Sequence, residues 1–152
     1  MPDSIDPYNL QRFIDAQQPV YMQVLSELRA GHKQTHWIWF IFPQLSGLGH
    51  SATARYFAIQ SLDEARTYLR HPTLGRRLRD CTELINQFQY RAVEEILGPV
   101  DALKFRSCMT LFLQAAEEDS IFLVSLKLFF AGQLDSPTLN LLNRVAINGP
   151  IV

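Results

Sequence analysis

The sequence predicts an all-α fold: a single compact multihelical domain over residues 1–152, in which several short helices surround one or two buried ones. Three observations support this prediction. The eight prolines all lie between periodic segments, and proline is tolerated at the start of a helix but breaks its interior. Apolar residues recur at the three- and four-residue spacing of a helix. Alternation of polar and apolar residues never extends far enough to build a sheet.

Capping residues and glycines mark the expected helices along the chain. Serine and aspartate side chains accept hydrogen bonds from the free N–H groups of a first helical turn, and Ser61 with Glu64 has the spacing of a capping box. Gly31 and Gly132 are placed to end two of the helices. The expected helices cover residues 7–16, 19–30, 52–57, 61–71, 73–88, 92–97, 101–116, 121–131 and 136–142. Their N-terminal caps are expected at Asp6, Ser51, Ser61, Asp101, Ser120 and Ser136.

Two of these helices are candidates for the centre of the fold. The helix over 101–116 carries Phe105, Cys108 and Phe112 on one apolar face. The helix over 121–131 is apolar on nearly all sides, which is typical of a helix buried in the middle of a domain. We therefore expect both helices to lie in the core.

A run of six apolar residues, Trp37–Phe42, places four aromatic side chains within the segment 36–43. Tryptophan, isoleucine and phenylalanine suit a strand, but no partner strand is predicted. Alternatively, Thr35 caps a short helix that ends at Pro43, because the residue before a proline is pushed out of helical geometry. Both faces of the run are apolar in either case. We therefore expect burial on nearly all sides, and a role in the core alone would account for the run.

The run HWIWFIFPQLSGLGHS, residues 36–51, resembles the signature of a family catalogued as domain of unknown function 1810. Ile38 stands where that family more often has methionine. The resemblance implies a mainly helical fold and no assigned activity. It covers nearly the whole chain, extending to DPYNLQRFIDAQ (6–17), YFAI (56–59), EARTYLRHPTLGRRL (64–78), KFRSCMTLF (104–112) and LDSPTLNLL (134–142).

A ligand pocket beside the aromatic run is the first functional hypothesis. Two tryptophans would form an aromatic wall, and a buried indole N–H requires a polar partner. Glycines in the loop over 47–51 permit close backbone approach, and the helix that follows offers free N–H groups to an anion. The candidate ligand-binding residues are His36, Trp37, Trp39, Gln44, Gly47, Gly49, Ser51, Lys104 and Ser107.

Lys104 and Ser107 lie three residues apart on the expected helix over 101–116. A long cation seldom enters a core without a partner, so Lys104 either extends to solvent or meets a carboxylate or a ligand anion. Metal binding is not predicted. His32 and His36 are four residues apart, but a zinc site needs further ligands, and Gly31 interrupts the helix that would hold them.

Five arginines fall between residues 66 and 79 and, together with His71, could hold a phosphate or an acidic partner. The acidic residues that alternate with them favour a solvated helix face instead. The arginines are Arg66, Arg70, Arg76, Arg77 and Arg79, and the acidic residues are Asp63, Glu64, Asp80 and Glu83.

Composition limits the classes of function. The net charge is −1, so the chain has no overall attraction for nucleic acid or an acidic membrane, and neither is expected as a partner. No apolar run is long enough to cross a membrane, and the N-terminus lacks the features of a signal peptide. Cys81 and Cys108 lie in apolar helical patterns, which indicates buried thiols in a reducing compartment. We expect a cytoplasmic protein without a cofactor.

Two functions agree with these observations. The first is binding of a small anionic or nucleotide-like molecule beside the aromatic run and the glycine loop, with or without catalysis. The second is a non-catalytic protein-interaction module in which the aromatic run is only core. A cavity lined by His36, Gln44 and Ser51 would favour the first, and a filled interior with a flat apolar surface would favour the second.

Overall fold

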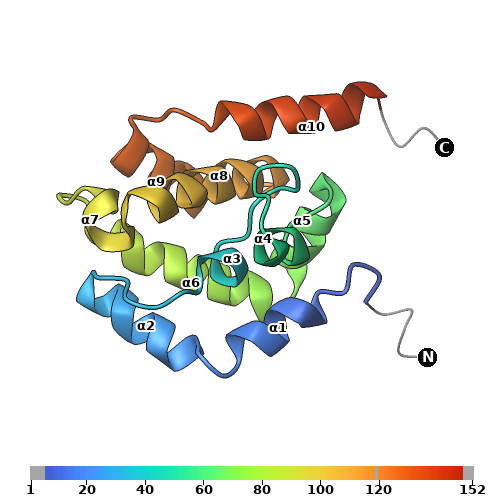
Figure 1. Cartoon of the computed structure of the whole chain (residues 1–152). Coiled ribbons are helices and arrows are strands. Elements are labelled where there is room, and N and C mark those ends of the chain that lie inside the picture. The colour runs from blue at the N-terminus through green and yellow to red at the C-terminus, as the bar shows by residue number, and fades with distance from the viewer. Residues whose placement is uncertain (1–5, 119, 149–152) are drawn as a thin grey trace.

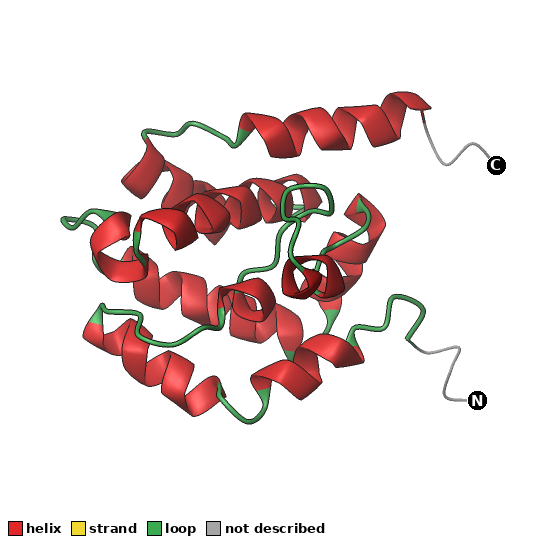
Figure 2. Cartoon of the chain, in the orientation of Figure 1, coloured by secondary structure: helices red, strands yellow, loops and turns green. Residues whose placement is uncertain are grey.

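The helices pack around one hydrophobic core, and the all-α prediction is confirmed. The computed structural model describes residues 6–118 and 120–148, and over those residues it contains helices and no strand (Figure 2). One isolated parallel bridge joins Leu45 and Ile59. The helices are α1 (Gln11–Gln17), α2 (Tyr21–Ala30), α3 (Ile38–Ile41), α4 (Ala52–Tyr56), α5 (Leu62–Arg70), α6 (Leu74–Asn86), α7 (Val93–Leu97), α8 (Pro99–Ala115), α9 (Ile121–Phe130) and α10 (Ser136–Asn148).

Helix α8 is the centre of this arrangement. It packs against α5, α7, α9 and α10, and its Phe105, Cys108 and Phe112 are fully buried. Figure 1 shows α10 along one side of the molecule and α1 and α2 along the opposite side, with α6 between α8 and the N-terminal helices. Among the described helices, none combines the length and the apolar character that a membrane crossing needs.

Helix α9 is less buried than its composition predicts. Phe122, Ser125 and Leu126 lie inside, but Val124 is 47% exposed and Lys127 is also exposed. The expectation that this helix lies fully inside the core is wrong, because it packs mainly on α8 and α6 and leaves its other side to solvent.

Three of the predicted caps are confirmed by hydrogen bonds. The hydroxyls of Ser51, Ser61 and Ser120 accept from the backbone N–H groups of the first turns of α4, α5 and α9 at 3.1, 3.1 and 3.0 Å. These caps depend on residues two or three positions apart. Local sequence therefore suffices to predict them.

The other three caps differ from the prediction. The Asp6 carboxylate accepts from the N–H groups of Leu10 and Gln11, but the residues between form turns, so α1 begins at Gln11 and not at residue 7. Asp101 does not cap α8, which begins two residues earlier at Pro99. Asp135 caps α10 in place of Ser136, because its carboxylate accepts from the N–H of Thr138.

The aromatic run forms one helical turn, α3, so the helical alternative is correct. Its N-cap is Trp37 and not Thr35, whose hydroxyl donates to Glu27 instead. Trp37, Ile38, Ile41 and Phe42 are buried, whereas Trp39 and Phe40 are only half-buried. The ring of Phe42 packs edge-to-face on Phe105 at 5.0 Å. The run is therefore mostly core, as composition suggests, but burial on nearly all sides is wrong for its two central residues.

Candidate functional site

The polar group of Trp37 is used inside the protein. Its indole N–H donates to Glu27 of α2 at 2.9 Å, and the ring is 1% exposed. The same carboxylate accepts from the backbone N–H groups of Gln34 and Thr35, from the Thr35 hydroxyl and from Gln23. Burial alone would raise the pKa of Glu27, but these hydrogen bonds outweigh it and lower the pKa to about 2. Trp37 therefore has no need of a ligand.

Three of the predicted residues come together at the surface. The ring of Trp39 lies 6.5 Å from the ring of His36 and 5.0 Å from the ammonium of Lys104. Lys104 also lies 3.9 Å from Asp101, which pairs with Lys33 at 2.8 Å. Lys104 therefore meets a carboxylate and an aromatic face, two of the partners that a half-buried cation requires.

The remaining predicted residues lie elsewhere. Ser107 is buried and its hydroxyl lies 3.0 Å from the Asp135 carboxylate, so it connects α8 to the start of α10. Gln44 is half-buried, and its backbone carbonyl accepts from the N–H of Ile59. Ser51 caps α4, a helix of five residues.

Both glycines of the predicted loop are explained by packing. Gly47 has a φ of +102°, and a Cβ at this position would lie 3.3 Å from the side chain of Leu141 in α10. A Cβ on Gly49 would lie 2.6 Å from the Cβ of Ala54 in α4. The positive φ at Gly47 and the close approach at Gly49 favour glycine whether or not the loop binds a ligand.

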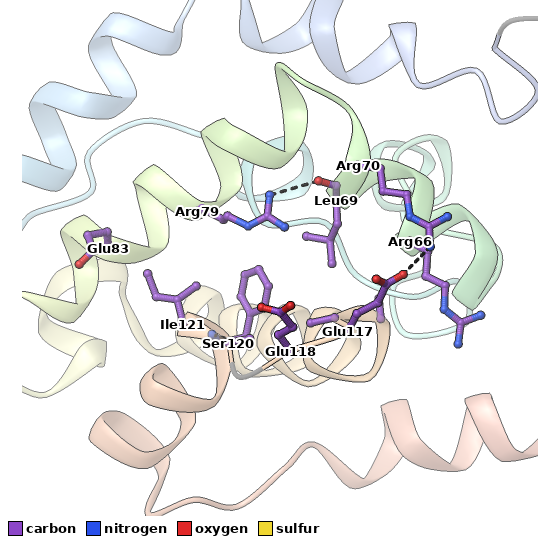
Figure 3. A pocket seen from close by; sticks show the side chains of 12 residues that line it. Arg66, Leu69, Arg70, Arg79, Glu83, Glu117, Glu118, Ser120 and Ile121 are labelled. Carbon is purple, nitrogen blue, oxygen red and sulfur yellow. Dashed lines mark hydrogen bonds and ion pairs between the residues drawn. The ribbon is translucent and has the colours of Figure 1, made fainter.

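A cavity of about 460 Å³ lies between α5, α6 and the connection from α8 to α9 (Figure 3). This volume is in the range of about 300–1,000 Å³ that small-molecule sites occupy. Three of the five arginines that the sequence singles out line the cavity. The lining residues are Arg66, Leu69, Arg70, Arg79, Glu83, Ala115, Ala116, Glu117, Glu118, Ser120, Ile121 and Phe122.

Two of the three arginines in this cavity are paired with carboxylates. Arg66 lies 3.2 Å from Asp63 in the same helix, and Arg70 lies 2.6 Å from Glu117 across the cavity. Both pairs are exposed, and exposed ion pairs hold their partners weakly. Arg66 and Arg70 can therefore exchange these partners for a ligand at small cost.

Arg79 has a different environment. One of its terminal nitrogens donates to the backbone carbonyl of Leu69 at 3.1 Å, at the end of α5. Among the described residues, it forms no ion pair. A guanidinium has five N–H donors, so most of those of Arg79 remain available to a ligand. Gly75, one turn earlier in α6, makes the approach of the two helices possible, because a Cβ there would overlap the Leu69 carbonyl.

A second cavity, of about 470 Å³, is also lined by an arginine, Arg12, but this arginine has no donor available for a ligand. Arg12 is 8% exposed and pairs with the buried Glu64 at 2.8 Å. All five of its donor positions are used. Besides Glu64, the acceptors are the backbone carbonyls of Tyr8, Asn9, Tyr56 and Ala58. Arg12 therefore holds the segment before α1 to the segment before α5.

The other arginines of the predicted cluster do not line the cavity. Arg77 donates to Gln17 and Gln18, and its guanidinium stacks on Tyr21. Arg76 is 83% exposed and lies 3.9 Å from Asp80. Within the described residues, no three His, Cys, Asp or Glu side chains gather as a metal site would require.

Sequence reasoning missed the acidic side of the cavity. Glu117, Glu118 and Ser120 follow the arginines by about forty residues or more, and nothing in their spacing connects them to α5 and α6. The only local signal is Ser120, which the sequence identifies as a helix cap. Neither of the two cavities includes one of the nine residues predicted for the ligand site.

The fold and this cavity define a class: an all-helical protein with a surface cavity of mixed charge between its helices. Comparison with protein families identifies it further. The chain belongs to the family described as "Protein of unknown function (DUF1810)", which matches residues 7–142 and confirms the resemblance seen in the sequence.

One solved structure is similar over nearly its whole length. It is the conserved hypothetical protein Rv1873 from Mycobacterium tuberculosis, with 51% sequence identity and a TM-score of 0.89. The match covers 91% of this chain and 99% of that chain. A comparison with curated proteins finds no match.

Proposed function

We propose that this protein binds a small molecule through an anionic group, in the cavity between α5, α6 and the α8–α9 connection. The observation that carries the proposal is the guanidinium of Arg79. It lines a cavity of suitable volume, and its one hydrogen bond within the described residues is to a neutral carbonyl. Planar guanidinium groups recognise carboxylates and phosphates through paired hydrogen bonds.

Two further features support an anionic group at this position. Arg70 is already bound to a carboxylate, that of Glu117, so the cavity accommodates the chemistry of a carboxylate on arginine. The first turn of α9, a helix of ten residues, also borders the cavity through Ser120 and Ile121. Helix N-termini favour negative charge.

Binding beside the aromatic run is a second candidate, favoured by the cluster of His36, Trp39 and Lys104. We rank it lower for two reasons. Lys104 already has partners in Trp39 and Asp101, and Trp37 has its partner in Glu27. No buried side-chain nitrogen or oxygen among the described residues lacks a hydrogen-bond partner, so the interior near the run requires no ligand atom.

Two arginines of the same helix provide the test. Inorganic phosphate is titrated into the natural protein and into Arg79→Gln and Arg76→Gln variants, with binding followed by NMR chemical shifts. Loss of one charge-assisted hydrogen bond weakens binding by about tenfold or more, so Arg79→Gln should show this loss. Arg76→Gln should bind phosphate like the natural protein, because Arg76 is exposed and does not line the cavity. Equal effects of the two substitutions, or no saturable binding, would refute the proposal.

A further inference from the structure

We propose that the ligand of this cavity is a small zwitterion, with its anionic group on Arg79 and a cationic group on Glu118. This inference rests on the proposed function and names the class of molecule that the site takes. Its basis is the charge that remains after the internal ion pairs of the cavity are accounted for.

Among the described residues, the cavity contains three arginines and three glutamates. Arg66 is paired with Asp63 and Arg70 with Glu117, which neutralises one end of the cavity. Arg79, Glu83 and Glu118 remain, and among the described residues none of these three forms an ion pair. The remaining charges are thus of both signs.

A ligand with negative charge alone should bind at Arg79 but more weakly than a zwitterion. An anion bound to Arg79 would share the cavity with two carboxylates, which would repel it. A cationic group on the same ligand removes this cost, since an ammonium donates to a carboxylate in a charge-assisted hydrogen bond. Attraction at both ends of one molecule also selects against simple anions and simple cations.

The two groups that would hold the ligand lie on different walls of the cavity. Arg79 lies on the α6 wall and Glu118 on the wall formed by the α8–α9 connection, and both point into the space between them (Figure 3). Leu69, Ile121 and Phe122 supply apolar surface between these walls. Amino acids and short peptides have the required chemistry, because each carries one anionic and one cationic group on the same molecule.

Three probes with five-carbon chains separate the possibilities. They are 5-aminopentanoate, which is a zwitterion, glutarate, which carries two negative charges, and cadaverine, which carries two positive charges. Each is titrated by NMR into the natural protein and into Arg79→Gln and Glu118→Gln variants. Glu118 is exposed, so its substitution should leave the fold unchanged, and an unfolding curve checks this.

The zwitterion should bind about tenfold more tightly than glutarate or cadaverine, which is the difference that one charge-assisted hydrogen bond makes. In Glu118→Gln this preference over glutarate should disappear, and in Arg79→Gln the zwitterion should bind at least about tenfold more weakly. If glutarate bound as tightly as the zwitterion and its binding depended on Arg79, the inference of a zwitterionic ligand would be overturned and the proposed function would remain. Failure of phosphate, glutarate and the zwitterion to bind would overturn both, as would preferential binding of cadaverine.

Discussion

The indole N–H of Trp37 and the carboxylate of Glu27 meet at 2.9 Å and fix the segment before α3 onto α2. Glu27 is 3% exposed and accepts hydrogen bonds from three other residues as well. One acidic side chain therefore organises the loop that leads into the aromatic run.

Replacement of Glu27 by Gln should destabilise the protein and change its response to acid. The folded-state pKa, about 2, lies below the ordinary 4.5, so the ionised group contributes stability above pH 4.5 that is lost as the pH falls toward 2. That contribution is on the order of 3 kcal/mol. Urea unfolding at several pH values should show a loss of this order at pH 7 and a flatter dependence below pH 4.5. Glu94→Gln, at an exposed position, is the control, and an equal response in both variants would contradict the role of Glu27.

Trp37 and Trp39 should differ in their contributions to stability. Trp37→Ala should cost roughly 3–5 kcal/mol, as truncation of a buried aromatic side chain does. Trp39 is half-buried and covered partly by Lys104, so Trp39→Ala should cost only about 1–2 kcal/mol. Chemical denaturation of the two variants measures the difference. If Trp39→Ala lowered the free energy of unfolding more than Trp37→Ala, the assignment of Trp37 as the core tryptophan would be wrong.

Gly75→Ala should destabilise the protein, against the usual trend for helices. Alanine in a helix interior is normally more favourable than glycine by about 1 kcal/mol. At position 75 the added methyl group would overlap the backbone carbonyl of Leu69, so α5 and α6 would have to move apart. A thermal melt should show a lower midpoint for Gly75→Ala. An increase would mean that the helices do not approach as closely as the structure indicates.

The two thiols should be inert in the folded protein. Cys81 and Cys108 are buried, and burial raises the pKa of Cys81 to about 12 and that of Cys108 well above its ordinary value. Because the thiolate is the reactive species, a colorimetric thiol reagent should modify neither cysteine at pH 8 until denaturant is added. Rapid modification under native conditions would contradict this burial.

The parts of the fold that the sequence predicts correctly are those determined by neighbouring residues. Ser51, Ser61 and Ser120 cap their helices because the accepting hydroxyl and the donating N–H are only two or three residues apart. The sequence predicts a similar role for Asp101, but that helix starts earlier, at Gly98 and Pro99. The Asp101 carboxylate pairs with Lys33 and Lys104 instead. The tertiary contacts are needed to determine at which of these residues α8 begins.

The candidate site could be predicted only in part, for the same reason. The arginines of 66–79 are evident in the sequence, but which of them share a cavity depends on the packing of α5 and α6 against a connection about forty residues later. The sequence also cannot distinguish Arg79, with most of its donors available, from Arg12, whose donors are all used. The sequence does identify His36, Trp39 and Lys104 as candidates for one site, because all three lie in segments that resemble the family, 36–51 and 104–112.

The central claim is that an anionic group binds at Arg79. Its most direct test is a map of amide chemical-shift changes in the ¹⁵N-labelled protein as inorganic phosphate is added. The account predicts saturable changes concentrated at Leu69, Arg79 and the residues from Ala116 to Ile121. Changes concentrated between His36 and Ser51 would place the ligand at the aromatic run and contradict the account, as would the absence of any saturable change.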